Sequence, residues 1–180
     1  MPPPGHIAAG YLVARALFHF NHPAFTSTQI TNLIWLGTFF GFAPDLDFFY
    51  TLFRIKRWTV REDGENHRNY VSHVPIIWLA AGLAVYFLTS DPFVKYVGLL
   101  LWLGSWSHFI LDTFSYGIMW AWPFSREVFA FKNKKIRIDI EEQRFLPFWI
   151  KFVQVYATKA WLSFSLEVGL IIAASVVFLR

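Results

Sequence analysis

Long apolar stretches alternate with short polar ones along most of the chain. Residues 30–50, 71–89, 93–112 and 161–179 each have the length and apolar character of a helix that crosses a membrane, which takes about 20 residues. A shorter apolar stretch covers residues 6–20, which either cross as a short helix or lie at the membrane interface. We therefore expect an all-α, polytopic transmembrane helical bundle of about five spans, with residues 1–180 forming a single membrane domain.

Two polar loops, residues 51–70 and 126–160, hold most of the 16 Lys and Arg residues. Because basic residues gather in the cytoplasmic loops of membrane proteins, both loops are predicted to be cytoplasmic, with the N-terminus inside and the C-terminus outside. In the second loop, Ile136, Ile138 and Ile140 alternate with polar residues, which predicts a short strand or β-hairpin. A basic amphipathic element that lies on anionic lipid is the alternative for this segment.

The composition agrees with a membrane protein and excludes several other classes. Hydrophobic residues make up 56% of the 180 residues and charged residues 16%, which excludes intrinsic disorder. The chain has no cysteine, which excludes a disulfide scaffold and a cysteine zinc finger. The net charge of +4 is modest, so no nucleic-acid partner is expected. A soluble all-α protein with buried apolar helices is the alternative to a membrane bundle.

Ionisable side chains gather at one predicted membrane depth. Such a group costs about 2.5–3.5 kcal/mol at the middle of a span on insertion scales, so the groups that do occur tend to mark a site. They stand at the cytoplasmic ends of the predicted spans, with His67 and His73 at the entrance to the span at residues 71–89. The candidate site residues are His6, Asp45, Asp47, His67, His73, His108 and Asp112.

The residue types in this set are those of a metal site. His108 and Asp112 are four positions apart, so both side chains share one face of a helix. Asp45 and Asp47 follow Pro44, which ends a regular helix and can present both carboxylates. Without cysteine the ligands must be nitrogen and oxygen, a set that suits zinc, manganese or iron. Of these we expect zinc, with manganese possible. Such a number of ligands allows one or two ions, and two-metal sites commonly hydrolyse phosphoesters.

The same residues also have structural explanations. The His108–Asp112 pair could be a hydrogen bond on a helix face, and Asp45 could cap a helix or pair with a nearby arginine. Arg68 follows His67 and could either hold a substrate anion or anchor a cytoplasmic loop. In a hydrolase, we expect Arg68 to hold the phosphate and one aspartate, Asp45 first, to stay available as a general base.

Several short motifs occur in a fixed order along residues 5–125. They are Gly5-His6, Pro44-Asp45-Leu46-Asp47, His67-Arg68, Ser72-His73, His108-x3-Asp112 and Trp122-Pro123-Phe124. In this order they resemble the YdjM/YbcI-like inner-membrane proteins, a family described as membrane-bound metal-dependent hydrolases. That family is more distantly similar to zinc-dependent phospholipase C and to P1-type nucleases. The chain departs from the usual family pattern at one place. Here one extra residue separates His67 from His73, and Val74 stands where the family has a serine after the second histidine.

Together, the residues and the resemblance predict a membrane-embedded metal-dependent hydrolase, and the resemblance alone implies that the membrane is a prokaryotic plasma (inner) membrane. The resemblance implies hydrolysis of a phosphoester, and we expect a lipid or lipid-linked substrate at the cytoplasmic rim, with membrane lipids as partners. An ion or metal transporter is one alternative, because intramembrane ionisable residues also mark ion pathways. A non-catalytic membrane protein with a structural metal is another.

Overall fold

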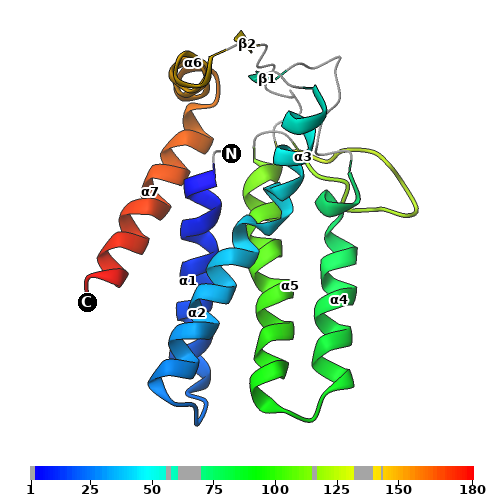
Figure 1. The fold of residues 1–180 in the computed structure, drawn as a ribbon, viewed down its shortest axis with the longest axis vertical. Coiled ribbons are helices and arrows are strands. Elements are labelled where there is room, and N and C mark those ends of the chain that lie inside the picture. Colours follow the sequence, from blue (N-terminus) through cyan, green and yellow to red (C-terminus); the bar gives the residue numbers. More distant parts are fainter. Residues whose placement is uncertain (1–2, 56–57, 61–69, 115–116, 132–139, 143) are drawn as a thin grey trace.

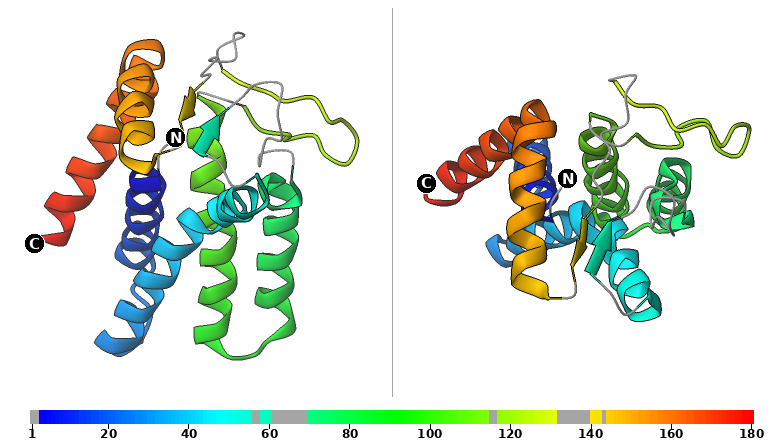
Figure 2. Two further views of the ribbon diagram at one scale, coloured as in Figure 1. Left: turned by 45° about the horizontal axis from the view of Figure 1, so that its top comes forward. Right: turned by 90° about the horizontal axis from the view of Figure 1, so that it is seen from above.

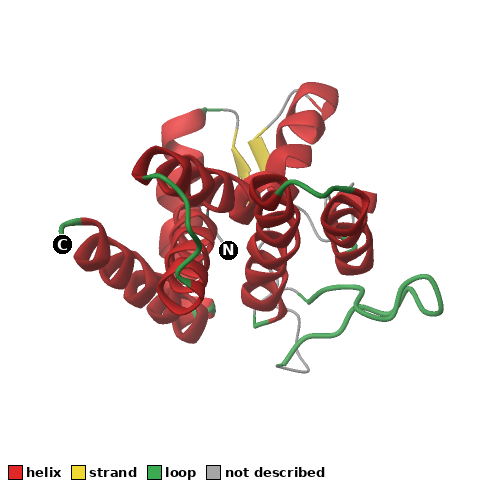
Figure 3. Cartoon of the chain, turned by 90° about the horizontal axis from the view of Figure 1, so that it is seen from below, coloured by secondary structure: helices red, strands yellow, loops and turns green. Residues whose placement is uncertain are grey.

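The computed structural model describes residues 3–55, 58–60, 70–114, 117–131, 140–142 and 144–180. Within these residues the chain is mostly helical, which confirms the predicted all-α class (Figure 3). In chain order the elements are α1 (Pro3–Asn21), α2 (Ser27–Phe42), the 3-10 turn η1 (Ala43–Asp45), α3 (Leu46–Ile55), β1 (Trp58–Val60), the 3-10 turn η3 (Val71–His73), α4 (Pro75–Leu88), α5 (Pro92–Thr113), β2 (Ile140–Glu142), α6 (Phe145–Lys159) and α7 (Trp161–Phe178).

The long helices α1, α2, α4, α5 and α7 run lengthwise, and α6 lies across one end of them (Figure 1). Figure 1 views α6 along its own axis, whereas the view from above shows its full length (Figure 2). Helix α5 packs against α1, α2 and α4, and α1 also packs against α7. The chain runs toward the α6 end in α2 and α5 and away from it in α1, α4 and α7 (Figure 1).

Local sequence signals explain where the helices begin and end. Thr26 and Gln29 form a capping box at the start of α2, and Asp91 caps α5 by accepting a hydrogen bond from the Phe93 amide. Pro44 lacks the amide hydrogen that would continue α2, and its ring clashes with the helical backbone. Residues 30–50, which we predicted as one span, are therefore divided among α2, η1 and α3.

Glycines let the long helices approach one another closely. A Cβ atom on Gly10 would lie 2.5 Å from the Gly37 carbonyl oxygen, and one on Gly41 would lie 2.6 Å from the His6 carbonyl oxygen. The backbones of α1 and α2 are therefore in direct contact along this interface. Small residues at helix crossings are typical of membrane bundles, where close backbone packing drives association.

Two described helices have the length and hydropathy of membrane spans, α5 and α7, and α4 is a shorter apolar helix. In the most apolar window of α7, only 11% of the residues are buried. The core helix of a soluble protein would be mostly covered, so this exposure favours lipid around α7. The five-span bundle is not confirmed by these helices and stays a prediction.

The short strand predicted near residue 140 forms, but its partner differs from the prediction. β2 pairs antiparallel with β1 from the other polar loop, with Thr59 opposite Glu141. Ile136 and Ile138 lie outside the described residues, so the predicted hairpin within residues 126–160 is not confirmed. The pairing of β1 with β2 instead joins the two loops that the sequence predicted on one membrane face.

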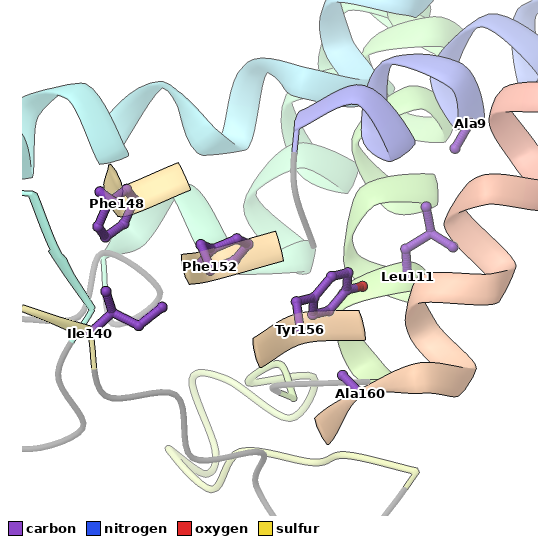
Figure 4. Close-up of a cluster of buried hydrophobic side chains, with 7 residues drawn as sticks. All are labelled: Ala9, Leu111, Ile140, Phe148, Phe152, Tyr156 and Ala160. Carbon is purple, nitrogen blue, oxygen red and sulfur yellow. The ribbon is translucent and has the colours of Figure 1, made fainter. Parts of the chain in front are cut away.

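Helix α6 is held by a cluster of buried side chains. Phe148, Phe152 and Tyr156 stack along one face of α6, with Tyr156 next to Leu111 of α5 and Phe148 on the side of Ile140 of β2 (Figure 4). Their spacing of four residues places them on one side of the helix. The cluster thus holds α6 over the ends of α1 and α5.

Candidate metal centre

The described candidate residues all come from the end of the bundle that α6 covers. His6 stands in the first turn of α1, whereas His108 and Asp112 stand in the last turns of α5. Asp45 ends η1, and His73 ends η3. Asp47 lies in the first turn of α3, and the predicted residues His67 and Arg68 lie outside the described residues.

Three imidazole Nε2 atoms converge on two carboxylates. The Nε2 atom of His6 lies 3.4 Å from Asp112 Oδ1 and 3.9 Å from Asp45 Oδ2. His108 Nε2 lies 3.6 Å from Asp45 Oδ1 and 3.8 Å from Asp112 Oδ2. His73 Nε2 lies 3.5 Å from Asp45 Oδ1. These five side chains, His6, Asp45, His73, His108 and Asp112, are called the donor cluster below.

These spacings are long for hydrogen bonds but right for ligands of one cation. Nitrogen–oxygen hydrogen bonds fall between about 2.7 and 3.2 Å. Two ligands on one tetrahedral zinc, each at about 2.0–2.1 Å, lie about 3.4 Å apart. The measured separations of 3.4 to 3.9 Å lie at and slightly above that value. The residues present therefore fit a metal ion.

Hydrogen bonds to the other ring nitrogens orient two of the imidazoles. His108 Nδ1 lies 3.1 Å from the Gly41 carbonyl oxygen, and His73 Nδ1 lies 2.9 Å from Asp47 Oδ2. With these acceptors, each Nδ1 carries the proton and donates, so Nε2 faces the cluster with its lone pair. Ser72 also donates its hydroxyl to Asp47 Oδ2. Partners of this kind are typical behind metal-binding histidines.

Burial makes the cluster costly without a ligand. His6, His73, His108 and Asp112 are 0% exposed. Among the described residues, the Nε2 atoms of His6 and His108 have no hydrogen-bond partner. A buried polar atom left in this way costs about 1–3 kcal/mol. Binding of a cation would satisfy these nitrogens and balance the two carboxylates.

The donor cluster divides into two overlapping groups. One is His6, His108 and Asp112, and the other is Asp45, His73 and His108. In each group the candidate ligand atoms lie within 4.8 Å of one another. Because His108 offers a single Nε2 lone pair, it can serve only one ion at a time. The geometry accommodates one ion with a mixed ligand set or two ions that share the carboxylates.

The carboxylates of the cluster affect the pKa values of the two groups that stand outside the long helices. Asp45 and His73 stand in the short turns η1 and η3, outside the long helices. Burial alone would raise the pKa of Asp45, but His108, His73 and His6 outweigh it and hold the pKa below its usual range. Burial alone would lower the pKa of His73, but the neighbouring carboxylates of Asp45 and Asp47 outweigh it and raise the pKa above its usual value. The carboxylates that attract a proton here would also attract a metal cation.

Asp47 lies beside the donor cluster. It belongs to neither candidate group, and its Oδ2 atom lies 2.9 Å from Nδ1 of His73. Its role as a ligand stays a prediction. Sequence reasoning did not identify the Gly41 carbonyl, because a backbone acceptor leaves no signal in residue types. It also left out Glu167, whose Oε1 atom accepts a hydrogen bond from the Gly5 amide beside His6. The available signal for Glu167 was a lone carboxylate in an apolar helix.

The comparisons with known proteins identify one family. The family described as YdjM inner membrane protein matches residues 1–180 of this chain. No curated protein and no solved structure matches it.

Proposed function

The chain belongs to the YdjM inner membrane protein family, and from that premise we propose that it is a metal-dependent hydrolase of phosphoesters within the inner membrane. The observation that carries the proposal is the convergence of three Nε2 atoms on two carboxylates at ligand spacing. Mixed imidazole and carboxylate sets suit zinc, with manganese as the second choice. One or two ions would be held by the donor cluster.

Each residue of the site has a proposed role in this reaction. The donor cluster would hold the ion, which, when bound, supplies Lewis acidity and activates water. Asp47 would keep Nδ1 of His73 protonated and its ring in place. Asp45 lies within 3.9 Å of all three histidines and is proposed first as a ligand, and its role as a general base stays a prediction. His67 and Arg68 stay predictions, as a further ligand and a phosphate-holding residue.

We further propose that α1, α2, α4, α5 and α7 each cross the membrane, with the α6 end in the cytoplasm. In support, these helices lie lengthwise and alternate in direction (Figure 1). The two basic loops, 51–70 and 126–160, both leave the bundle at the end that carries β1 and β2. This arrangement agrees with the positive-inside rule.

The position and exposed faces of helix α6 are the evidence for a lipid substrate. It lies across the ends of the long helices and would therefore lie in the plane of the membrane (Figures 1 and 2). One face, with Leu146, Ile150 and Val153, is apolar and 44 to 65% exposed. Exposed polar residues occupy the next face, among them Gln154. A helix with protein, lipid and water on successive faces is suited to the membrane interface, so a headgroup phosphoester would lie near the depth of the cluster.

A structural metal in a non-catalytic membrane protein is the second candidate, because the donor cluster is buried. With three histidines and Asp112 at 0% exposure, a substrate would need a rearrangement to reach the ion. Closed coordination is typical of structural sites, whereas catalytic sites keep a position open. Both candidate functions require a bound ion, but only the hydrolase would turn over a phosphoester substrate.

Metal content and turnover of the purified protein test the proposal. Plasma mass spectrometry is expected to find about one or two zinc or manganese ions per wild-type chain in detergent. The His108→Ala/Asp112→Ala variant should lose them, whereas His19→Ala, an exposed histidine on the same helix as His6, should keep them. Wild type without ion, after incubation with each metal, would overturn the proposal.

Turnover is then measured in detergent with bis(p-nitrophenyl) phosphate and with phosphatidic acid. Hydrolysis that depends on the ion and is lost in the double variant supports the hydrolase. Because detergent abolishes any gradient, turnover also argues against a transporter. An ion that stabilises the fold while no phosphoester is cleaved would favour the structural metal.

A further inference from the structure

Glu167 is a buried carboxylate on an otherwise lipid-suited helix. It is 4% exposed, whereas its helix α7 displays exposed apolar residues such as Ile172 and Val176. Its Oε1 atom accepts a hydrogen bond from the Gly5 amide at 3.1 Å, across 162 positions of sequence. Placing a carboxylate within a spanning helix costs free energy, and such residues generally pair with another group and serve a function.

The first turn of α1 is built to receive this carboxylate. Pro3 and Pro4 have no amide hydrogen, so Gly5 supplies the first backbone donor of the helix. Amides in a first helical turn lack acceptors within the helix, and a negative charge there also complements the helix dipole. A Cβ atom on residue 5 would lie 2.4 Å from Cγ of Glu167. Glycine at this position therefore allows the close approach.

His6, the next residue, needs this support more than the other histidines do. His73 and His108 are each oriented by an acceptor at Nδ1. Among the described residues, neither ring nitrogen of His6 has a hydrogen-bond partner. Its ring stacks on His108 at 3.7 Å between centroids, and its carbonyl faces Gly41. The backbone and packing therefore set the position of its Nε2 atom.

We propose that Glu167 is a positioning residue of the metal centre. By holding the Gly5 amide it fixes the first turn of α1, and thereby His6, against the carboxylate of Asp112. Acceptors at Nδ1 orient the rings of His73 and His108, but among the described residues the ring of His6 has no such acceptor. Glu167 instead orients His6 through the backbone, by accepting from the Gly5 amide. The helix α7 thus takes part in metal binding without contributing a ligand. This inference rests on the proposed metal centre and is independent of whether the protein hydrolyses a phosphoester.

A set of variants at both ends of the contact tests the inference. Zinc affinity is measured by competition with a chromophoric chelator on full-length protein in detergent. Glu167→Ala is expected to weaken zinc binding about 10-fold or more, as partners behind metal ligands do. Glu167→Gln keeps the Oε1 acceptor and should bind within about 3-fold of wild type. Ser163→Ala, a buried polar residue one turn earlier on α7, is the matched control and should bind like wild type.

Gly5→Ala tests the same contact from the other helix. Its new Cβ would clash with Glu167, so zinc binding should weaken, but the double variant Gly5→Ala/Glu167→Ala should bind no worse than Glu167→Ala alone. Additive losses in the double variant would contradict the contact. Zinc affinity unchanged in Glu167→Ala, with affinity lost in His108→Ala/Asp112→Ala, would overturn the inference while leaving the metal centre intact.

Hydrogen exchange of the metal-free protein provides a readout that needs no ion. In Glu167→Ala, amides in the first turns of α1 should exchange faster, while those of α4 should not change. A variant that loosens the whole protein would raise both rates and lower Tm, and this would contradict a specific positioning role. Wild type that binds neither zinc nor manganese would remove the proposed function and this inference together.

Discussion

Gly41 lies where helix packing and the candidate metal centre meet, and Gly41→Ala tests whether that packing sets the geometry of the donor cluster. The added Cβ would lie 2.6 Å from the His6 carbonyl oxygen and 2.8 Å from Gly10 Cα. Both neighbours are backbone atoms, which cannot move aside by a rotamer change. Ordinary contact begins near 3.4 Å, so α1 and α2 must separate by about 0.8 Å in a close-packed interior.

This displacement is large on the scale of a metal site. Ligand distances are held to about 0.2 Å, so His6 would move several times that tolerance. Overpacking typically costs about 1–3 kcal/mol of stability. Gly41 also supplies the carbonyl that accepts from His108 Nδ1, so the orientation of a second imidazole changes with it. We expect zinc binding to weaken by at least 10-fold and Tm to fall.

Gly169→Ala is the matched control for this substitution. It is also a glycine-to-alanine change in a helix, but a Cβ atom there meets nothing within 4 Å. Its stability should be equal to or slightly above wild type, because alanine favours helix by up to about 1 kcal/mol. Zinc competition and thermal unfolding of both variants in one detergent provide the assay. If Gly41→Ala binds zinc and melts like Gly169→Ala, the reasoning from backbone contact is refuted.

Three further predictions concern the surroundings of the site. Asp47→Ala removes the acceptor that orients His73, so zinc affinity should fall about 10- to 100-fold. The number of ions bound at saturating zinc should stay the same. Loss of the ion at saturating zinc would show instead that Asp47 is a ligand. Because the chain has no cysteine, single introduced cysteines can probe the surroundings of α6. In lipid nanodiscs, a membrane-impermeant maleimide should label Gln154→Cys much faster than Ile150→Cys. Equal labelling rates would contradict an interfacial helix. Chelation should lower Tm of wild type but not of His108→Ala/Asp112→Ala, because an ion at 100 times its Kd stabilises the folded state by about 2.7 kcal/mol; an unchanged wild-type Tm would contradict a bound ion.

The helical class and the location of the site were predictable because both depend on local pattern. Apolar stretches of about 20 residues indicate helices that cross a membrane. When consecutive helices alternate in direction, residues at the end of one and the start of the next reach the same face. This is why His6, Asp45, His73 and Asp112, far apart in sequence, were expected together and are found together.

Helix boundaries were less predictable where hydropathy and backbone chemistry disagree. Residues 30–50 are continuously apolar apart from two aspartates, so hydropathy predicted one span. Pro44 cannot supply a helical hydrogen bond, and the structure divides the stretch at that point. The same break turns Asp45 toward the histidines and leaves Asp47 beside His73. A local rule about proline thus carried more information than the window average.

The amino-acid sequence by itself determined the all-α class, the end of the bundle that carries the donor cluster and the chemical types of its side chains, because these follow from hydropathy, composition and helix direction. Only the tertiary structure decided which nitrogen of each histidine faces the cluster, that β2 pairs with β1, and that Glu167 reaches Gly5. These features depend on atoms brought within a few ångströms by packing between remote segments. No periodicity in a single segment encodes such distances.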